Sequence, residues 1–372
     1  MNTTTASDHE RYAWIRLSLE PNLGADTARL LLANFGLPHQ IYEQSVGTLN
    51  RFIPTALATQ LRSTLPDELE AKIQATLHWL QSPDQHLICL ADSHYPSALL
   101  TLADPPLVLY AKGDLSQLQY PGLAIVGARS ATESGKKNAY DFAQFLCQQG
   151  WSIISGLASG VDAAAHQGAL AAQQAHSTIA VFGTGLDFVY PARNRTLAHQ
   201  IAVQGLLLSE FPLGTRGLPH HFIRRNRLVA ALAKGVLVVE AALKSGSLTT
   251  ARFATDIGRE VFAIPGSIHS PLHKGCHQLI RSGAKLVESA EHILEELQPT
   301  QPLLQPMPRS TATTPLSNTQ QQLLDCMGYD PISADHIQLR SGLSTAQVGA
   351  LLVQLELSDH IIQHKDGKYQ RR

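Results

Sequence analysis

Short apolar runs that end in glycine or serine recur in the middle of the chain. The segments 125–130, 154–160 and 181–185 read IVGARS, ISGLASG and VFGTG. Each run has the length and β-branched content of a buried strand, and the small residues after it suit a turn from strand into helix. Glycine in such a turn lets backbone N–H groups approach a ligand, and the next helix adds its positive N-terminus.

The same alternation continues towards the C-terminus. Further strands are predicted at 206–211, 235–241, 260–264 and 285–288, and helices at 163–173, 222–233 and 247–257. Seven strands alternating with helices predict an α/β fold, an extended Rossmann-like, doubly wound parallel sheet. Ligands of such sheets bind outside the carboxyl ends of the strands.

The two ends of the chain have different patterns. Residues 11–80 lack strand signals and predict a small helical domain, with Pro66 at the start of its last helix. The segment 298–316 holds five prolines and predicts a linker. Helices predicted at 319–327, 334–341 and 345–357, followed by a hairpin over 361–369, form a winged helix. The predicted domains are 1–80, 81–297, the linker 298–316, and 317–372.

Charge is distributed unevenly. The chain has 29 Lys and Arg against 30 Asp and Glu, yet residues 188–239 hold seven basic residues and one acid, Glu210. A local positive face suits a polyanion or a phosphate-bearing ligand. The winged-helix segment has five basic and six acidic residues, so we predict no base readout there.

Two clusters carry candidate chemistry. Phe222 stands beside Arg224, Arg225 and Arg227, which combines a ring for base stacking with guanidiniums for phosphates. The second cluster is a set of anion-binding loops made of Gly127, Ser130, Ser245, Gly246, Ser247 and Thr249. Ser247 is predicted to cap the helix after this loop. A purely structural alternative, in which Glu240 is buried and accepts backbone hydrogen bonds, stays open.

An ordered series of motifs resembles the DprA/Smf family. It comprises VGAR at 126–129, SGLASGVDAAAH at 155–166, GTGLD at 183–187, YP at 190–191, SEFP at 209–212, Phe222 with RNR at 225–227, and IPGS at 264–267. The resemblance covers roughly residues 90–290 and is too long to arise by chance. Ala128, Ile223 and His277 depart from residues common in the family.

The resemblance implies a function in DNA processing during natural transformation. Members bind incoming single-stranded DNA without sequence preference, protect it, promote RecA loading and form homodimers. By position, the residues implied to contact the strand are Arg129, Gly156, Phe222, Arg225, Asn226 and Arg227. The arginines would pair with phosphates, Gly156 would permit close approach, and Phe222 would stack on a base.

Two other classes of protein are also compatible with these residues. A nucleotide hydrolase of the lysine-decarboxylase-like phosphoribohydrolase type would use Glu240 or Asp162 as the base and Arg129 as a phosphate anchor. A nucleotide sensor would share the pocket without turnover. The four cysteines show no paired spacing, so we expect no metal site and no cofactor. Without a signal peptide or long apolar run, we expect a cytoplasmic protein with no membrane span.

Overall fold

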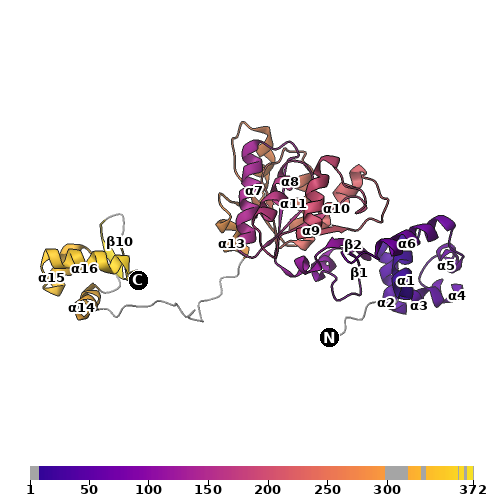
Figure 1. Cartoon of the computed structure of the whole chain (residues 1–372), viewed down its shortest axis with the longest axis horizontal. Coiled ribbons are helices and arrows are strands. Elements are labelled where there is room, and N and C mark those ends of the chain that lie inside the picture. Colours follow the sequence, from indigo (N-terminus) through magenta and orange to yellow (C-terminus); the bar gives the residue numbers. More distant parts are fainter. Residues whose placement is uncertain (1–7, 298–316, 328–331, 359, 364–366, 372) are drawn as a thin grey trace. The chain divides into compact units, whose positions relative to one another are not determined.

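The computed structural model describes residues 8–297, 317–327, 332–358, 360–363 and 367–371 (Figure 1). The chain divides into two compact units, Met1–Thr300 and Gln301–Arg372. The linker predicted at 298–316 lies outside the described residues.

A single nine-stranded sheet organises the first unit. Its order is β1-β2-β6-β5-β4-β3-β7-β8-β9. The strands are β1 (Gln85–Cys89), β2 (Val108–Gly113), β3 (Gly122–Val126), β4 (Ser152–Ser155), β5 (Thr178–Val181), β6 (Leu206–Ser209), β7 (Gly235–Val238), β8 (Glu260–Ala263) and β9 (Lys285–Leu286). All pairs among β3 to β9 are parallel. The predicted doubly wound α/β sheet is therefore confirmed.

Strands β1 and β2 were not predicted. They pair with each other and with β6 in antiparallel orientation at one edge of the sheet. Since β1 has a partner on one side only, its first three residues are half-buried. Edge residues of this kind lack the continuous apolar pattern of strands covered on both faces.

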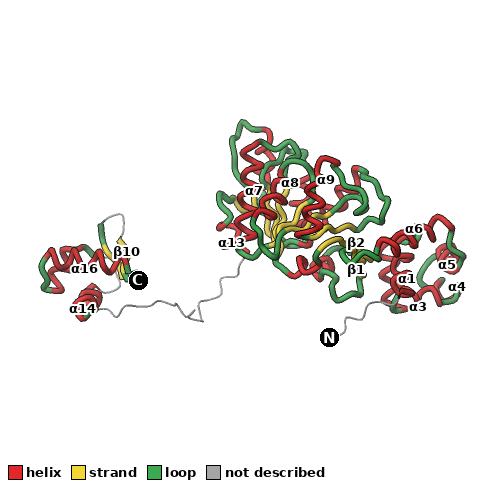
Figure 2. Tube along the Cα trace, in the orientation of Figure 1, coloured by secondary structure: helices red, strands yellow, loops and turns green. Residues whose placement is uncertain are grey.

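Helices cover both faces of the sheet, as Figure 2 shows. They are α7 (Glu133–Gln148), α8 (Val161–Ala171), α9 (Arg195–Gln204), α10 (Pro219–Leu232), α11 (Gly246–Asp256), α12 (Lys274–Arg281) and α13 (Glu291–Leu297), with short 3-10 helices at Ser97–Thr101, Leu115–Gln119, Ala192–Asn194 and Pro271–His273. Side chains of β3 alternate between the layers. Leu123 and Ile125 pack in the core under α7 and α8, and Ala124 and Val126 pack in the core under α10 and α11.

The strand order reverses between β3 and β7. From β3 the chain winds outwards through β4, β5 and β6, whereas β7, β8 and β9 extend on the other side. Register pairs Val126 with Val238, so both strands end at the same level. Such a switch point leaves a crevice at the carboxyl ends of the strands, where ligands of this fold class bind.

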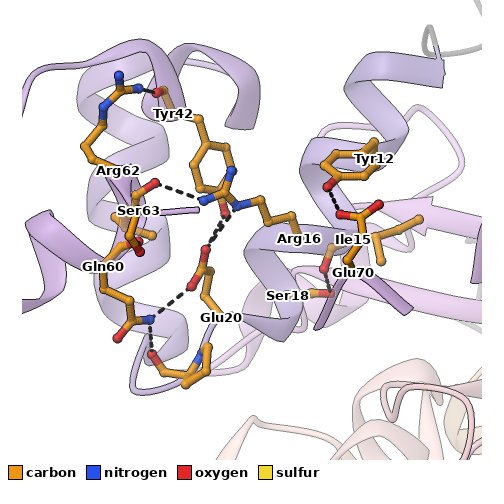
Figure 3. Close-up of polar contacts among 12 residues, drawn as sticks. Tyr12, Ile15, Arg16, Ser18, Glu20, Tyr42, Gln60, Arg62, Ser63 and Glu70 are labelled. Atoms are coloured by element: carbon orange, nitrogen blue, oxygen red, sulfur yellow. Dashed lines mark hydrogen bonds and ion pairs between the residues drawn. The ribbon is translucent and has the colours of Figure 1, made fainter. Parts of the chain in front are cut away.

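The first unit begins with the predicted helices, α1 (Asp8–Leu19), α2 (Ala25–Phe35), α3 (Pro38–Glu43), α4 (Val46–Leu49), α5 (Thr55–Arg62) and α6 (Asp67–Trp79). Pro66 is the N-cap residue of α6, as predicted. Figure 3 shows the polar network that joins α1 to α3 and α5. Arg16 forms an ion pair with Glu20 at 3.1 Å and its guanidinium lies 3.8 Å from the centre of the Tyr42 ring. Gln60 of α5 donates to Glu20 at 3.0 Å, so the network stabilises helix packing.

The second unit contains the predicted winged-helix elements. They are α14 (Asn318–Met327), α15 (Ala334–Ser341), α16 (Thr345–Leu357), β10 (Ile361–Gln363) and β11 (Tyr369–Arg371), with β10 and β11 antiparallel. Leu323, Ile337 and Leu352 join in a hydrophobic core of its own. Part of the predicted hairpin turn, 364–366, lies outside the described residues. Among the helices that the structure describes, none is long and apolar enough to cross a membrane.

Candidate nucleic-acid interface

A cavity of 470 Å³ opens where β3, β4 and β7 end. Its walls come from the loop 127–130 after β3, Gly156 and Ala158 after β4, the segment 242–247 before and at the start of α11, and one face of α10. The strand-then-glycine loops predicted from the sequence thus converge at the switch point of the sheet.

Helix α10 presents one face to this cavity. Phe222, Arg225, Asn226 and Val229 all line it, and their spacing of three and four residues places them on one side of a helix. Arg224 and Arg227 lie on another side, where both pair with Glu210. The structure therefore separates the three arginines that the sequence analysis grouped together.

Arg225 is buried, and only 5% of its surface is exposed. Its Nη1 donates to the carbonyl oxygen of Gly156 at 2.5 Å and to that of Val181, and its Nε donates to Asn226 Oδ1 at 3.1 Å. No acceptor among the described residues bonds Nη2, which keeps some accessible surface beside the cavity. Burial lowers the pKa of Arg225 to about 10, so the guanidinium stays charged at neutral pH.

Asp162 supports this arrangement from the start of α8. Its Oδ2 accepts from the backbone N–H groups of Gly156 at 3.1 Å and Ala158 at 3.3 Å, which shapes the loop after β4. Burial raises the pKa of the Asp162 carboxyl, and the Arg225 guanidinium opposes that shift. These hydrogen bonds favour a structural role for Asp162 in the loop after β4 over a role as a catalytic base.

Phe222 lies between the first cavity and a second one of 450 Å³. The second cavity is also lined by Arg129, Tyr190, Pro191 and Arg193. The Phe222 and Tyr190 rings are 5.2 Å apart between centroids and inclined by 39°. A stacking role was predicted for Phe222 and not for Tyr190, although Tyr190 and Pro191 belong to one of the family motifs.

The residues predicted to form anion-binding loops do not all line one cavity. Gly127, Ser130, Ser245, Gly246 and Ser247 line the 470 Å³ cavity, whereas Thr249 lines a different cavity along α11 and α12. Ser245 is the N-cap of α11 and its hydroxyl accepts from Ser247 N–H at 3.3 Å. The prediction that Ser247 caps this helix was wrong by two residues, because the helix begins at Gly246.

Three cations stand exposed around the two cavities: Arg129, Lys244 and Arg193. None forms a hydrogen bond or an ion pair with another residue in the described ranges. Sequence analysis did not assign Lys244 and Arg193 to the site, although both belong to the glycine- and serine-containing loops of the predicted strand ends. Unpaired cations grouped in this way attract an anion with more than one charge.

Arg227 does not reach either cavity. Its side chain is 7% exposed and its Nη2 lies 2.5 Å from Glu210 Oε2, with Asp104 at 3.4 Å from Nε. A guanidinium buried against a carboxylate is not available to a ligand, so this position does not favour the phosphate contact that the resemblance implies for Arg227. Arg227 instead joins α10 to Glu210, directly after β6, and to Asp104, in the segment before β2.

Glu240 lies after β7 and is buried. Its contacts agree with the structural alternative, in which this carboxylate accepts hydrogen bonds within the protein. Its Oε2 accepts from the Thr132 N–H at 2.9 Å and its Oε1 accepts from the Thr132 hydroxyl at 2.5 Å. Thr132 is the N-cap of α7, and Gly135 in the first turn leaves room for the carboxylate. Glu240 thus stabilises the N-terminus of α7.

Comparisons with known proteins agree with this architecture. The family profile described as DNA recombination-mediator protein A matches residues 86–298, and the DprA winged helix domain matches residues 307–367. Protein Smf of Escherichia coli K12 is 38% identical over 94% of this chain and 92% of its own length. DNA processing protein DprA of Streptococcus pneumoniae is 46% identical over 56% of this chain and 73% of its own length.

Two solved structures are also similar. DNA processing protein A of Streptococcus pneumoniae superposes with a TM-score of 0.67 at 34% identity, over 78% of this chain and 99% of that chain. The Helicobacter pylori protein, whose structure is described for its single-stranded DNA binding mode, superposes with a TM-score of 0.52 at 33% identity, over 57% of this chain and 95% of that chain. The sheet, the cavity at its switch point and these relatives together show that the chain belongs to the DprA/Smf family of DNA-processing proteins.

Proposed function

We propose that this protein binds single-stranded DNA without sequence preference, across the two cavities at the carboxyl ends of β3, β4 and β7. One observation carries the proposal. Three exposed, unpaired cations surround a loop and helix terminus suited to phosphate, directly beside an aromatic pair. The Helicobacter pylori relative, described for its single-stranded DNA binding mode, supports the same ligand.

Each group then has a role in binding. Arg129 and Lys244 would pair with phosphates, and the N–H groups of Gly246 and Ser247 would add hydrogen bonds at the N-terminus of α11. Arg225 would fix the loop after β4 and present its free Nη2 to the strand. No member of this set recognises one base in particular, so sequence preference is expected to be weak.

Preference for a single strand follows from the aromatic rings. A ring can stack only on a base whose face is open, and in a duplex neighbouring pairs cover both faces. The cations also outnumber those that one phosphate needs, which favours a polynucleotide over a mononucleotide.

Fluorescence anisotropy with single-stranded and duplex oligonucleotides across a salt series tests the proposal. We expect single-strand preference, affinity that rises with length and falls steeply with salt, and weaker binding in Arg129→Ala and Phe222→Ala. Arg51→Ala is the control, because Arg51 is exposed in the helical part and lines neither cavity. Equal affinity for duplex and single strand, or indifference to both changes, would refute this function.

The hydrolase alternative with Glu240 is less well supported. Both carboxylate oxygens are occupied by Thr132, the residue is 2% exposed, and it does not line the cavity. A general base must reach the proton that it removes. We therefore propose a binding protein rather than an enzyme.

Family membership leads to three further parts of the proposal: the protein acts as a homodimer, it operates in the cytoplasm, and it promotes loading of RecA. Light scattering of the full chain tests the dimer, and fractionation of cells tests the location. RecA ATPase activity on single strands covered with single-strand-binding protein tests loading, with stimulation by the full chain as the expected result.

A further inference from the structure

The edges of the Phe222 ring lie against two glycines, Gly183 and Gly217. A Cβ added at Gly183 would lie 2.7 Å from Phe222 Cδ1, and one added at Gly217 would lie 2.8 Å from Cζ. Both distances are shorter than any real contact, so these glycines leave just enough room for the ring. Phe222 is accordingly half-buried.

A base has no space between Phe222 and Tyr190. Stacking on both rings at once would require about 7 Å between them, twice the contact distance of about 3.5 Å between carbon atoms. The observed centroid separation is 5.2 Å, with the rings inclined by 39°, which is the geometry of two rings packed on each other. The pair therefore offers its outer surface to a ligand.

Both rings line the 450 Å³ cavity, and Tyr190 is the more exposed of the two. Tyr190 is 49% exposed and lines the 450 Å³ cavity together with Arg129 and Arg193. Neither arginine is paired with another described residue, so both cations are free to bind the phosphates on either side of a base. Exposed aromatic area that shares a cavity with two free cations suits the binding of a single strand.

We infer that Tyr190 is the stacking platform for an unpaired nucleobase, and that Phe222 is the ring that holds Tyr190 in place. This inference rests on the proposed binding of single-stranded DNA and adds a residue to that site. Replacement of Phe222 then also removes the support of Tyr190, and replacement of Tyr190 removes its own contact with the base.

The test compares Tyr190→Ala and Tyr190→Phe on two ligands of equal length, an oligothymidylate and the same strand with abasic sites throughout. Tyr190→Ala is expected to weaken binding of oligothymidylate about tenfold, since stacking on one base contributes a factor of that order. Tyr190→Phe keeps a ring and should bind like the wild type. On the abasic strand all three proteins should bind equally, because no base is present to stack.

Phe188→Ala is the matched control, since Phe188 is a nearby exposed aromatic residue, 41% exposed, that lines neither cavity. An equal loss in Tyr190→Ala on both ligands would show a structural role and overturn the inference, as would wild-type affinity on oligothymidylate. Either result leaves the proposed function standing if Arg129→Ala still weakens binding. Failure of the wild type to bind oligothymidylate would refute the proposed function itself.

Discussion

The guanidinium of Arg225 occupies the space that a side chain at Gly156 would need. A Cβ at Gly156 would overlap Nη1, Nη2 and Cζ of Arg225, and the carbonyl oxygen of Gly156 accepts from Nη1 at 2.5 Å. Glycine is thus required after β4 because a buried arginine from α10 fills the space beside it. The two residues are 69 positions apart in the sequence. The loop after β4 and the cavity face of α10 are therefore a single structural feature.

Gly156→Ala tests this relationship. The added methyl group must displace the guanidinium, so we expect a loss of about 1–3 kcal/mol in the free energy of unfolding and about tenfold weaker binding of single strands. Urea unfolding and anisotropy measure the two effects. Gly47→Ala in α4 serves as the control, because the nearest atom to its added Cβ is 3.8 Å away. Unchanged binding in Gly156→Ala would show that Arg225 does not shape the interface.

Arg224 and Arg227 share the same oxygen of Glu210 and differ in burial, which makes them a matched pair. The Arg227 side chain is 7% exposed, and that of Arg224 is 51% exposed. Arg227→Ala leaves Glu210 buried without its main partner and should lower the free energy of unfolding by about 3–5 kcal/mol. Arg224→Ala should cost at most about 1 kcal/mol. Equal destabilisation of the two variants in urea would contradict the assignment.

Arg129→Ala, unlike Arg227→Ala, should weaken DNA binding without lowering the stability of the fold. Arg129 is exposed and pairs with no other described residue, so its removal should leave the midpoint of thermal unfolding unchanged. Loss of one phosphate contact should reduce the slope of log K against log salt by about 0.7 for a single strand. Anisotropy at several salt concentrations measures that slope, and an unchanged slope would remove Arg129 from the interface.

His166 predicts a pH dependence of stability. The Thr178 hydroxyl donates to the Ile153 carbonyl oxygen, so it accepts from His166 Nδ1, and the buried Nε2 has no hydrogen-bond partner among the residues that the structure describes. Burial lowers the pKa of His166 to about 3. Between pH 6.5 and 3 the unfolded chain binds a proton that the folded chain does not. The contribution of neutral His166 to the free energy of unfolding is therefore fully present above pH 6.5. It is lost as the pH falls, by about 1.4 kcal/mol per pH unit.

His166→Asn, which keeps a donor for Thr178, should remove this component. Urea unfolding between pH 4 and 7 measures how the free energy of unfolding depends on pH. We expect a smaller slope for the variant than for the wild type, and the difference should correspond to the uptake of about one proton on unfolding. Parallel curves for the two proteins would mean that His166 is protonated in the folded state.

Thr132 and Glu240 should behave as a coupled pair. Glu240→Ala is expected to lower the free energy of unfolding by about 1.5–3 kcal/mol, because it removes two hydrogen bonds to a buried carboxylate. Combined with Thr132→Val in a double-mutant cycle, the two losses should not add. Folded Glu240→Ala should bind single strands like the wild type. Hydrolysis of nucleoside monophosphates by the wild type, lost in this variant, would instead support the enzyme alternative.

The winged-helix unit should contribute little to binding of the strand. Helix α16 contains no Lys or Arg, and the unit packs around its own core. A chain ending at Thr300 retains the compact first unit, so its affinity and salt slope should match those of the full chain. If the shortened chain instead gave a smaller slope of log K against log salt, by an amount equal to two or more phosphate contacts, the second unit would bind DNA.

Strands β3 to β9, helices α8, α10 and α11, the helices of the second unit and the loops that converge on the cavity could be predicted from the sequence alone, whereas α7, α9, α12 and α13 were not predicted. These features depend on residues close together in the chain: apolar runs of strand length, glycine where a turn is needed, and helical spacing. The spacing of Phe222, Arg225, Asn226 and Val229 also lies in the sequence and could have separated Arg225 from Arg224 and Arg227.

The role of each charged group could not be predicted from the sequence, because it depends on contacts between distant elements. Arg227 is buried because Glu210 and Asp104, distant in sequence, meet it behind α10. Glu240 is structural because Thr132 occupies both of its oxygens, and Tyr190 joins the site because its ring packs on Phe222. Local patterns specify the elements, but the partner and the exposure of a side chain follow from how those elements pack.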